Sequence, residues 1–321
     1  MLTGKVRNTI KKYRLIDKKE KVIVAVSGGP DSVAMLYLLK GLEDELCIKL
    51  YIAHLDHMLR RNSHKDAEFV KALAIKLGIP AIIAKFDVKK TLKNVSLEEA
   101  CRKARLEFLF EAAGKVKARK ICLGHNLDDQ AETVLMRLIR GSGLYGLSAI
   151  LPKRKFSGFT LIRPLLEVKR KEIEAFLKKN KISFRIDETN KEDIYLRNRL
   201  RNRLLPLLEK EYNANIKEVL SSTALSAGYD YDYLFAAAQK ALKRLGTKIR
   251  LPRFLKLHPA MQNLILRRSF SRVSGDTRRL TFKHTEEIND LILSRPDGSV
   301  VDLPKGVSAV KKKSCLIFYR R

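Results

Sequence analysis

A short glycine-containing segment near the N-terminus has the residue types of a phosphate-binding turn. Ser27-Gly28-Gly29-Pro30-Asp31-Ser32 follows an apolar run over 22–26 and precedes a helical pattern over 33–39. The glycines allow a tight turn with inward N–H groups, and the start of the next helix adds partial positive charge, so a phosphate could bind there. No Lys-Ser or Lys-Thr follows the second glycine as in the Walker A loop, which disfavours the common kinase and GTPase arrangement. The alternative is a purely structural turn in which Asp31 or Ser32 caps the helix.

A second polar group follows the apolar segment 120–124 and includes three carboxylates. It reads Gly124-His125-Asn126-Leu127-Asp128-Asp129-Gln130-Ala131-Glu132, and a helical pattern continues to residue 140. Asp129 and Glu132 are three residues apart and share a face near the helix start. Paired carboxylates beside a phosphate-binding turn could hold Mg²⁺ or receive a substrate ammonium group. Alternatively, these acids only cap the helix N-terminus.

Histidines and arginines form two further candidate groups. His54 and His57 end the predicted second strand, and a metal pair is conceivable. Without a third ligand at suitable spacing, we favour a polar strand-end loop that contacts a base or ribose. Arg102 and Arg105 are one helical turn apart in the predicted helix 97–113, where they form either a functional pair or a solvated basic face.

The elements that position these groups alternate between apolar runs and helical patterns up to about residue 190. We predict strands over 21–26, 48–55, 81–87, 120–124 and 160–165, with helices between them. This alternation is typical of an α/β fold with a parallel, doubly wound sheet. Ligands bind beyond the carboxyl ends of such strands, and each motif above falls at such an end. We therefore expect one site there.

The charge of the chain indicates a polyanionic partner. The 321 residues include 66 Lys and Arg against 35 Asp and Glu, a net charge of +31, and nucleic acid is the commonest partner of so basic a protein. Between residues 240 and 283, Asp276 is the single acid among many basic residues, which favours contacts with a phosphate backbone. We predict a second, mainly helical basic domain with a short β-like tail. Tyr229, Tyr231 and Tyr233 are expected to pack a helix seam rather than to stack on bases.

Two classes of protein are disfavoured by composition. No apolar run approaches the length of a membrane span and no signal-peptide core is present, so we expect a cytoplasmic protein without a membrane partner. The cysteines form no Cys-x-x-Cys pair, which argues against a zinc ribbon, an iron–sulfur site or a redox dithiol. They are Cys47, Cys101, Cys122 and Cys315.

The order of four motifs resembles the N-type ATP pyrophosphatases, which cleave ATP to AMP and pyrophosphate while adenylating a substrate. The motifs are SGGPDS (27–32), AHLDHMLR (53–60), GHNLDDQAETVLMRLIRGSG (124–143), and DETN (187–190) with YLRNRLRNRLLPLLE (195–209). Together they are similar to the branch of the family that attaches lysine to a tRNA. The resemblance implies an adenine nucleotide alpha hydrolase-like fold, with a catalytic domain over 1–214 that ends in a basic helical connector and a tRNA-binding domain over 215–321.

The resemblance also implies a reaction and its partners. ATP, with Mg²⁺, adenylates the C2 oxygen of the wobble cytidine in tRNA(Ile) with a CAU anticodon. The amino group of free L-lysine then displaces AMP and gives lysidine. The same resemblance allows for a homodimer.

The resemblance assigns roles to the candidate residues. The turn and His54 would bind the nucleotide, Arg105 and Arg197 would stabilise phosphate or the adenylated base, and His125 would accept a proton. Asp129 and Glu132 would grip the lysine ammonium group. The full candidate set is, for the nucleotide, Ser27, Gly28, Gly29, Pro30, Asp31, Ser32 and His54; for catalysis, Asp31, Arg105, His125, Asp129, Glu132 and Arg197; and for the metal, Asp31 and Glu132.

Two alternatives stay open at this point. A tRNA base thiolase of the same ATP pyrophosphatase type also adenylates a base carbonyl, but such enzymes usually need paired cysteines. A non-catalytic tRNA-binding protein could keep the fold. Its mark would be loss of the loop aspartate or of the acidic group, and Asp31, Asp128, Asp129 and Glu132 are all present.

Overall fold

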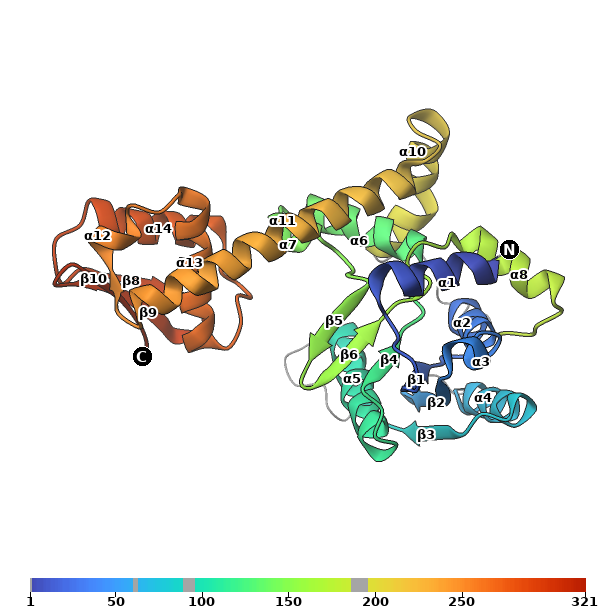
Figure 1. Cartoon of the computed structure of the whole chain (residues 1–321). Coiled ribbons are helices and arrows are strands. Elements are labelled where there is room, and N and C mark those ends of the chain that lie inside the picture. Colours follow the sequence, from blue (N-terminus) through green and yellow to red (C-terminus); the bar gives the residue numbers. More distant parts are fainter. Residues whose placement is uncertain (1, 60–62, 89–95, 186–195) are drawn as a thin grey trace. The chain divides into compact units, whose positions relative to one another are not determined.

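The chain forms two compact units, residues 1–227 and 228–321 (Figure 1). The structure, a computed structural model, describes residues 2–59, 63–88, 96–185 and 196–321. The DETN motif at 187–190, Arg60 and Tyr195 lie outside the described residues. We call the two compact parts unit 1 and unit 2 and describe each by itself.

Unit 1 is built on a six-stranded sheet with the strand order β3-β2-β1-β4-β6-β5. The strands are β1 (Lys21–Ala25), β2 (Lys49–Asp56), β3 (Ala81–Lys85), β4 (Lys120–Cys122), β5 (Lys153–Phe156) and β6 (Phe159–Ile162). All neighbouring strands pair in parallel except β5 with β6. The predicted parallel α/β fold is therefore confirmed for this unit.

Helices cover both faces of this sheet (Figure 1). Val22 and Val24 of β1 point to a core that contains residues of α1, α2, α4 and α8, whereas Ile23 points to a core shared with α5. Because both faces are buried, β1 reads as a continuous apolar run instead of an alternating one. The helices of unit 1 are α1 (Leu2–Tyr13), α2 (Pro30–Lys40), α3 (Glu43–Leu46), α4 (His64–Leu77), α5 (Leu97–Lys115), α6 (Leu127–Ile139), α7 (Leu144–Leu147), α8 (Arg170–Lys179), α9 (Leu196–Arg199), the π-helical turn η3 (Leu200–Leu204) and α10 (Leu205–Glu211). The boundary with unit 2 falls within α11 (Ile216–Leu245).

The edge strand β5 was not predicted from the sequence. All four of its residues are exposed, and three of them are basic, so the segment carries no apolar alternation. It pairs with β6 through a two-residue hairpin in which Ser157 and Gly158 both have positive φ, 47° and 85°. Two positive φ values are the mark of a type I′ turn, whose twist matches that of the flanking strands.

Unit 2 differs from the mainly helical domain that we predicted. It contains a four-stranded antiparallel sheet with the order β7-β10-β9-β8, packed with helices around one core. The prediction was wrong because the strands after residue 299 were treated as a tail and not as the centre of the unit. Its elements after α11 are β7 (Ile249–Arg250), α12 (Leu251–Phe254), α13 (Pro259–Ser274), α14 (Phe282–Leu293), β8 (Val300–Leu303), the 3-10 turn η4 (Pro304–Gly306), β9 (Val307–Lys312) and β10 (Cys315–Arg320).

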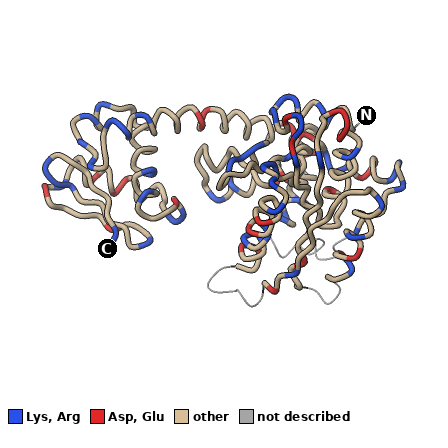
Figure 2. Tube along the Cα trace, turned by 60° about the horizontal axis from the view of Figure 1, so that its bottom comes forward, with Lys and Arg blue, Asp and Glu red and all other residues tan. Residues whose placement is uncertain are grey.

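The tyrosines of α11 also differ from expectation. Tyr229 and Tyr233 are 61% and 76% exposed, whereas Tyr231 stacks on Phe235 with ring centroids 5.6 Å apart. Seam packing therefore describes Tyr231 but not the other two. Figure 2 shows basic residues over both units. In the part of the chain that the structure describes, no helix has the length and apolar character needed to cross a membrane.

Candidate active site at the carboxyl ends of the strands

The segment 27–32 forms a tight turn between β1 and α2, as predicted. Gly28 has φ +91°, a conformation that favours glycine, and the α2 N-cap residue Gly29 makes no side-chain capping hydrogen bond. The Ser32 hydroxyl donates to the Gly29 carbonyl at 3.0 Å and accepts from the Ser27 N–H at 3.1 Å. Ser32 therefore braces the turn, and no N-cap side chain competes for the first N–H groups of α2.

Gly124, after β4, lets a second strand end approach this turn closely. A Cβ atom added to Gly124 would lie 3.2 Å from the Ser32 nitrogen and 3.3 Å from its Cα. These contacts are with backbone, which cannot move aside as a flexible side chain would. Because residue 124 has no side chain, the segment after β4 can lie directly against the turn after β1.

Asn126 connects the phosphate-binding turn to the acidic residues of α6. Its side-chain Nδ2 donates to Asp31 Oδ1 at 2.9 Å, and its Oδ1 accepts from the Asp129 N–H at 2.9 Å. Asp129 Oδ2 in turn accepts from the Asn126 N–H at 3.1 Å, which completes a capping box at the start of α6. Thus Oδ2 of Asp129 has the capping role that the alternative predicted, whereas its Oδ1 faces the other charged groups of the site.

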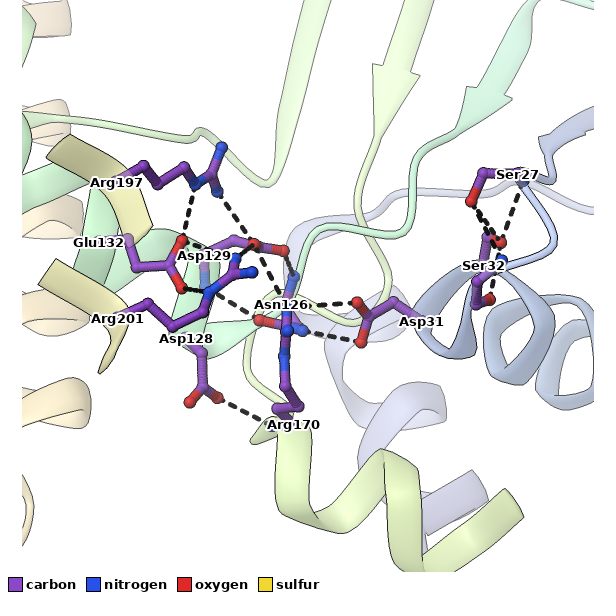
Figure 3. Close-up of polar contacts among 11 residues, drawn as sticks. Ser27, Asp31, Ser32, Asn126, Asp128, Asp129, Glu132, Arg170, Arg197 and Arg201 are labelled. Atoms are coloured by element: carbon purple, nitrogen blue, oxygen red, sulfur yellow. Dashed lines mark hydrogen bonds and ion pairs between the residues drawn. The ribbon is translucent and has the colours of Figure 1, made fainter. Parts of the chain in front are cut away.

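Glu132 lies between the guanidinium groups of Arg197 and Arg201, next to Asp129 (Figure 3). Its side chain is fully buried, and its oxygens accept from Arg197 Nε at 2.7 Å and from Arg201 Nε at 2.5 Å. Asp129 Oδ1 accepts from Arg197 Nη2 at 2.9 Å and from Arg201 Nη2 at 3.4 Å. Although burial lowers the pKa of both arginines, the two carboxylates outweigh it and raise the pKa of each. Both arginines are therefore charged.

The π-helical turn η3 sets the direction of Arg201. Leu200 and Leu205 are five residues apart, and both pack with Ala131 and Leu135 of α6. An α-helix would turn residues five apart away from each other, whereas a π turn aligns them. Arg201 lies inside this turn, where its guanidinium group reaches Glu132.

Arg170, at the start of α8, joins the turn and the acidic cluster from a distant part of the chain. Its Nη2 lies 3.4 Å from Asp31 Oδ2 and 3.7 Å from Asp129 Oδ1, and its N–H donates to Asp128 Oδ2 at 2.8 Å. Asp128 also pairs with Lys217 Nζ at 2.9 Å. Burial would raise the pKa of Asp128, but these two partners outweigh it and lower the pKa. Asp128 therefore ties α8 and α11 to the start of α6.

Burial acts differently on Asp31. It raises the pKa of Asp31 to about 6, against the opposing effect of the Arg170 guanidinium group. This carboxylate is thus poorly compensated, and a cation or a hydrogen-bond donor at the turn would stabilise its charged form.

The two predicted strand-end histidines do not form a metal pair with a third ligand. His54 Nδ1 lies 2.8 Å from the Val26 carbonyl oxygen, which it supports just before the turn, and its buried Nε2 has no partner among the described residues. Burial lowers the pKa of His57, and Arg105 lowers it further. Across the described ranges, no three His, Cys, Asp or Glu side chains gather in a way that could hold a metal.

His125 and Arg105 lie in a basic environment next to the acidic cluster. Burial lowers the pKa of His125 well below its usual value, and Arg163, Arg105 and Arg197 lower it further. His125 is therefore neutral, so a ring nitrogen is available as an acceptor, although burial and the neighbouring arginines oppose its protonated form. The Arg105 side chain remains accessible to solvent and has no carboxylate partner among the described residues.

Of the two predicted metal ligands, Asp31 and Glu132, only Asp31 suits this geometry. Mg²⁺ is usually held by one or two carboxylates together with phosphate oxygens. Asp31 suits that role because it lies at the turn and is poorly compensated. Both oxygens of Glu132 are engaged by guanidinium groups, so the role that we predicted for Glu132 would require both arginines to withdraw. Asp31 alone therefore stays a candidate ligand for Mg²⁺.

Sequence reasoning missed three residues of this site: Asn126, Arg170 and Arg201. Asn126 has a local signal, since an Asn three residues before an acid is the spacing of a capping box. Arg201 has one too, since it is four residues after Arg197 and shares its helix face. Arg170 is 139 residues from Asp31 and has no local signal.

Comparison with known proteins agrees with this geometry. Residues 2–208 match the PP-loop domain family, and residues 250–316 match the TilS substrate binding domain. A tRNA(Ile)-lysidine synthase of Clostridioides difficile is 38% identical over 99% of this chain and 70% of its own length. The chain belongs to the tRNA(Ile)-lysidine synthase family. The lysidine synthase of Geobacillus kaustophilus is 37% identical over the same shares of the two chains.

A solved structure of an enzyme with another activity has the same fold. The U34-tRNA thiolase NcsA of Methanococcus maripaludis, with its [4Fe-4S] cluster, aligns with a TM-score of 0.60 at 20% identity. The alignment covers 70% of this chain and 77% of the thiolase. At that identity the likeness concerns the fold, while the lysidine synthase relatives define the family.

Proposed function

We propose that this chain ligates lysine to the C2 position of the wobble cytidine of tRNA(Ile), using ATP and releasing pyrophosphate and AMP. The observation that carries the proposal is the bridge made by Asn126. It joins Asp31 of the phosphate-binding turn to Asp129 of the acidic cluster, so one side chain spans the groups for ATP and those for a second substrate. Membership of the family supports the same reaction.

The first step is adenylation of the cytidine. The turn and the N-terminus of α2 bind the phosphates of ATP, and the C2 oxygen of the base attacks the α-phosphorus. A bond forms between that oxygen and phosphorus while the bond to the β-phosphate oxygen breaks, and pyrophosphate leaves. Mg²⁺, when bound, would neutralise phosphate charge, and Asp31 would supply its protein carboxylate. Arg105 would stabilise the negative charge of the adenylate.

The second step is attack by lysine. An amino group of lysine bonds to C2, the bond between C2 and the phosphate oxygen breaks, and AMP leaves. The neutral His125 would accept the proton that the amine loses. Lysine carries both signs of charge, and so does the cluster: guanidinium edges of Arg197 and Arg201 suit its carboxylate, and Asp129 suits an ammonium group. Glu132, whose two oxygens both hold guanidinium groups, would position these arginines instead of gripping the ammonium group directly.

Recognition of the tRNA is assigned to the second unit together with the connector. Residues 250–316 match a domain described as substrate binding, and the segment 240–283 contains many more basic than acidic residues. We infer that this segment contacts the phosphate backbone. The affinity for tRNA should then fall steeply as salt concentration rises. We place the reaction in the cytoplasm, where ATP, free lysine and tRNA occur together.

The experiment that tests the function uses the purified chain, ATP, labelled lysine and total tRNA, followed by identification of the modified nucleoside. Incorporation of labelled lysine as lysidine, dependent on ATP, is the expected outcome. Transfer of sulfur without incorporation of lysine would instead indicate a thiolase. The four cysteines disfavour that outcome, since they form no Cys-x-x-Cys pair and Cys122 is buried.

A further inference from the structure

A second group of arginines lies next to the acidic cluster without carboxylates of its own. We define the carboxylate-free arginines as Arg102 and Arg105 of α5, Arg154 of β5, and Arg163, which follows β6. None of the four forms an ion pair with an acid within the described residues. Arg170, Arg197 and Arg201, by contrast, all contact Asp31, Asp129 or Glu132.

Arg163 is the buried member of this group. Its side chain is 6% exposed, its Nη1 donates to the Leu151 carbonyl at 2.7 Å, and its Nε is buried with no hydrogen-bond partner in the described part of the chain. A buried guanidinium group with an unused donor is costly unless an anion or water satisfies it. Burial, together with smaller effects of Arg154 and Arg102, lowers the pKa of Arg163 to about 10.

The other members surround Arg163 with accessible positive charge. Arg102, Arg105 and Arg154 are exposed, and Arg154 Nη2 lies 3.2 Å from the Tyr145 hydroxyl. Arg102 and Arg154 act electrostatically on Arg163, and Arg105 and Arg163 act on His125. The group therefore begins beside the proposed base His125 and extends towards the β5 edge of the sheet.

We propose that three of the carboxylate-free arginines, Arg102, Arg154 and Arg163, bind backbone phosphates of the RNA strand on either side of the reacting cytidine, while Arg105 keeps its role at the adenylate. The guanidinium fork matches a phosphate group, and several forks spread over α5, β5 and the end of β6 suit a chain of phosphates better than one small anion. ATP already has a place at the turn after β1. In the sheet order, β4 separates that turn from the strands that carry Arg154 and Arg163. This inference rests on the proposed function for the identity of the reacting base.

The test compares a double variant with a matched control. Arg102→Gln with Arg154→Gln removes two exposed members, so the core is not disturbed. The control, Lys117→Gln with Arg119→Gln, removes the same charge just before β4, at its amino end. The probe is a synthetic anticodon stem-loop RNA with a CAU loop, and the affinity is measured over a range of salt concentrations.

The double variant should bind the RNA about tenfold more weakly, and its salt slope should fall by about one to two, while the control matches the wild type. The KM for ATP should stay unchanged in both. Equal weakening in the control, unchanged affinity in the double variant, or a raised KM for ATP without an effect on RNA would overturn the proposal. If the wild-type chain binds the stem-loop through these residues but incorporates no lysine, the proposed function fails and the phosphate site stands.

Discussion

The two arginine groups of unit 1 lie side by side but have opposite electrostatic environments. Arg170, Arg197 and Arg201 are neutralised by carboxylates on α2 and α6, whereas the carboxylate-free arginines have none within the described residues. A paired arginine holds a structure together, because removing one partner leaves a buried charge. An unpaired arginine adds repulsion to the folded chain, which a bound anion would relieve. We therefore distinguish arginines that stabilise the structure of the site from arginines that bind a ligand.

The largest effect is expected for Asp31→Ala. Loss of this carboxylate removes the proposed cation ligand, so lysine- and tRNA-dependent formation of AMP should fall by about 100- to 1,000-fold. Binding of tRNA should remain nearly intact because the basic surfaces are unchanged. The measurement is AMP release together with a tRNA titration, with the exposed Asp44→Ala as control. Unaltered turnover would refute the role of Asp31.

The next effect concerns the stability of the paired group. Glu132→Gln leaves the guanidinium groups of Arg197 and Arg201 with one carboxylate fewer in a buried place, so the free energy of unfolding should fall by about 3 kcal/mol. Denaturant unfolding measures this change. Glu174→Gln, an exposed glutamate of α8, is the matched control and should change stability little. Equal stability of the two variants would mean that the buried cluster is not an ion-pair network.

A smaller effect of opposite sign is expected for Asp31→Asn. The folded-state pKa of about 6 lies above the ordinary value of 3.8, so the folded chain holds this proton more tightly than the unfolded chain does. Its contribution to stability is complete below the unfolded pKa and is lost as pH rises through about 6. Asp31→Asn should therefore stabilise the ligand-free protein by about 2 kcal/mol at pH 7.5. A stability difference that fails to shrink between pH 6 and pH 4 would contradict this assignment.

The smallest effect is expected for Arg102→Gln. Since this side chain is exposed and forms no ion pair with an acid among the described residues, its loss should leave the free energy of unfolding within about 0.5 kcal/mol or raise it slightly. Arg201→Gln, in the paired group, should cost about 2 kcal/mol. Similar losses in both variants would remove the distinction between the two groups.

The parallel sheet could be predicted from the sequence because each buried strand is an apolar run between helical patterns. Strand β5 could not, since its Lys-Arg-Lys segment pairs only along an exposed edge. In unit 2, β7 has only two residues and β8 has four, whereas β9 and β10 have six each. Strands were predicted in the last part of the chain, but no local pattern indicates that they form a sheet at the centre of the unit. The high positive charge of this part of the chain predicted a polyanionic partner, but it carries no information about the arrangement of strands and helices.

Within the site, arrangements set by residues close in the sequence could be predicted, whereas contacts between residues far apart in the sequence could not. Asp129 and Glu132 could be placed on one helix face from their spacing, and the turn at Ser27–Ser32 from its glycines. The contact of Arg170 with Asp31 forms only when α8 packs beside α2, and it cannot be predicted from the spacing of residues in the sequence. The engagement of Glu132 by two arginines likewise depends on how η3 packs against α6.

The π-helical turn η3 makes the length of this segment as important as its residues. If the same residues formed a regular α-helix, every later residue of α10 would rotate by about 100° about the helix axis, and Leu205 would leave the surface of α6. One residue fewer would instead place Leu200 and Leu205 four apart, the spacing that a regular α-helix aligns. A deletion between these leucines would thus keep both on α6, whereas a change of helical pitch at constant length would not.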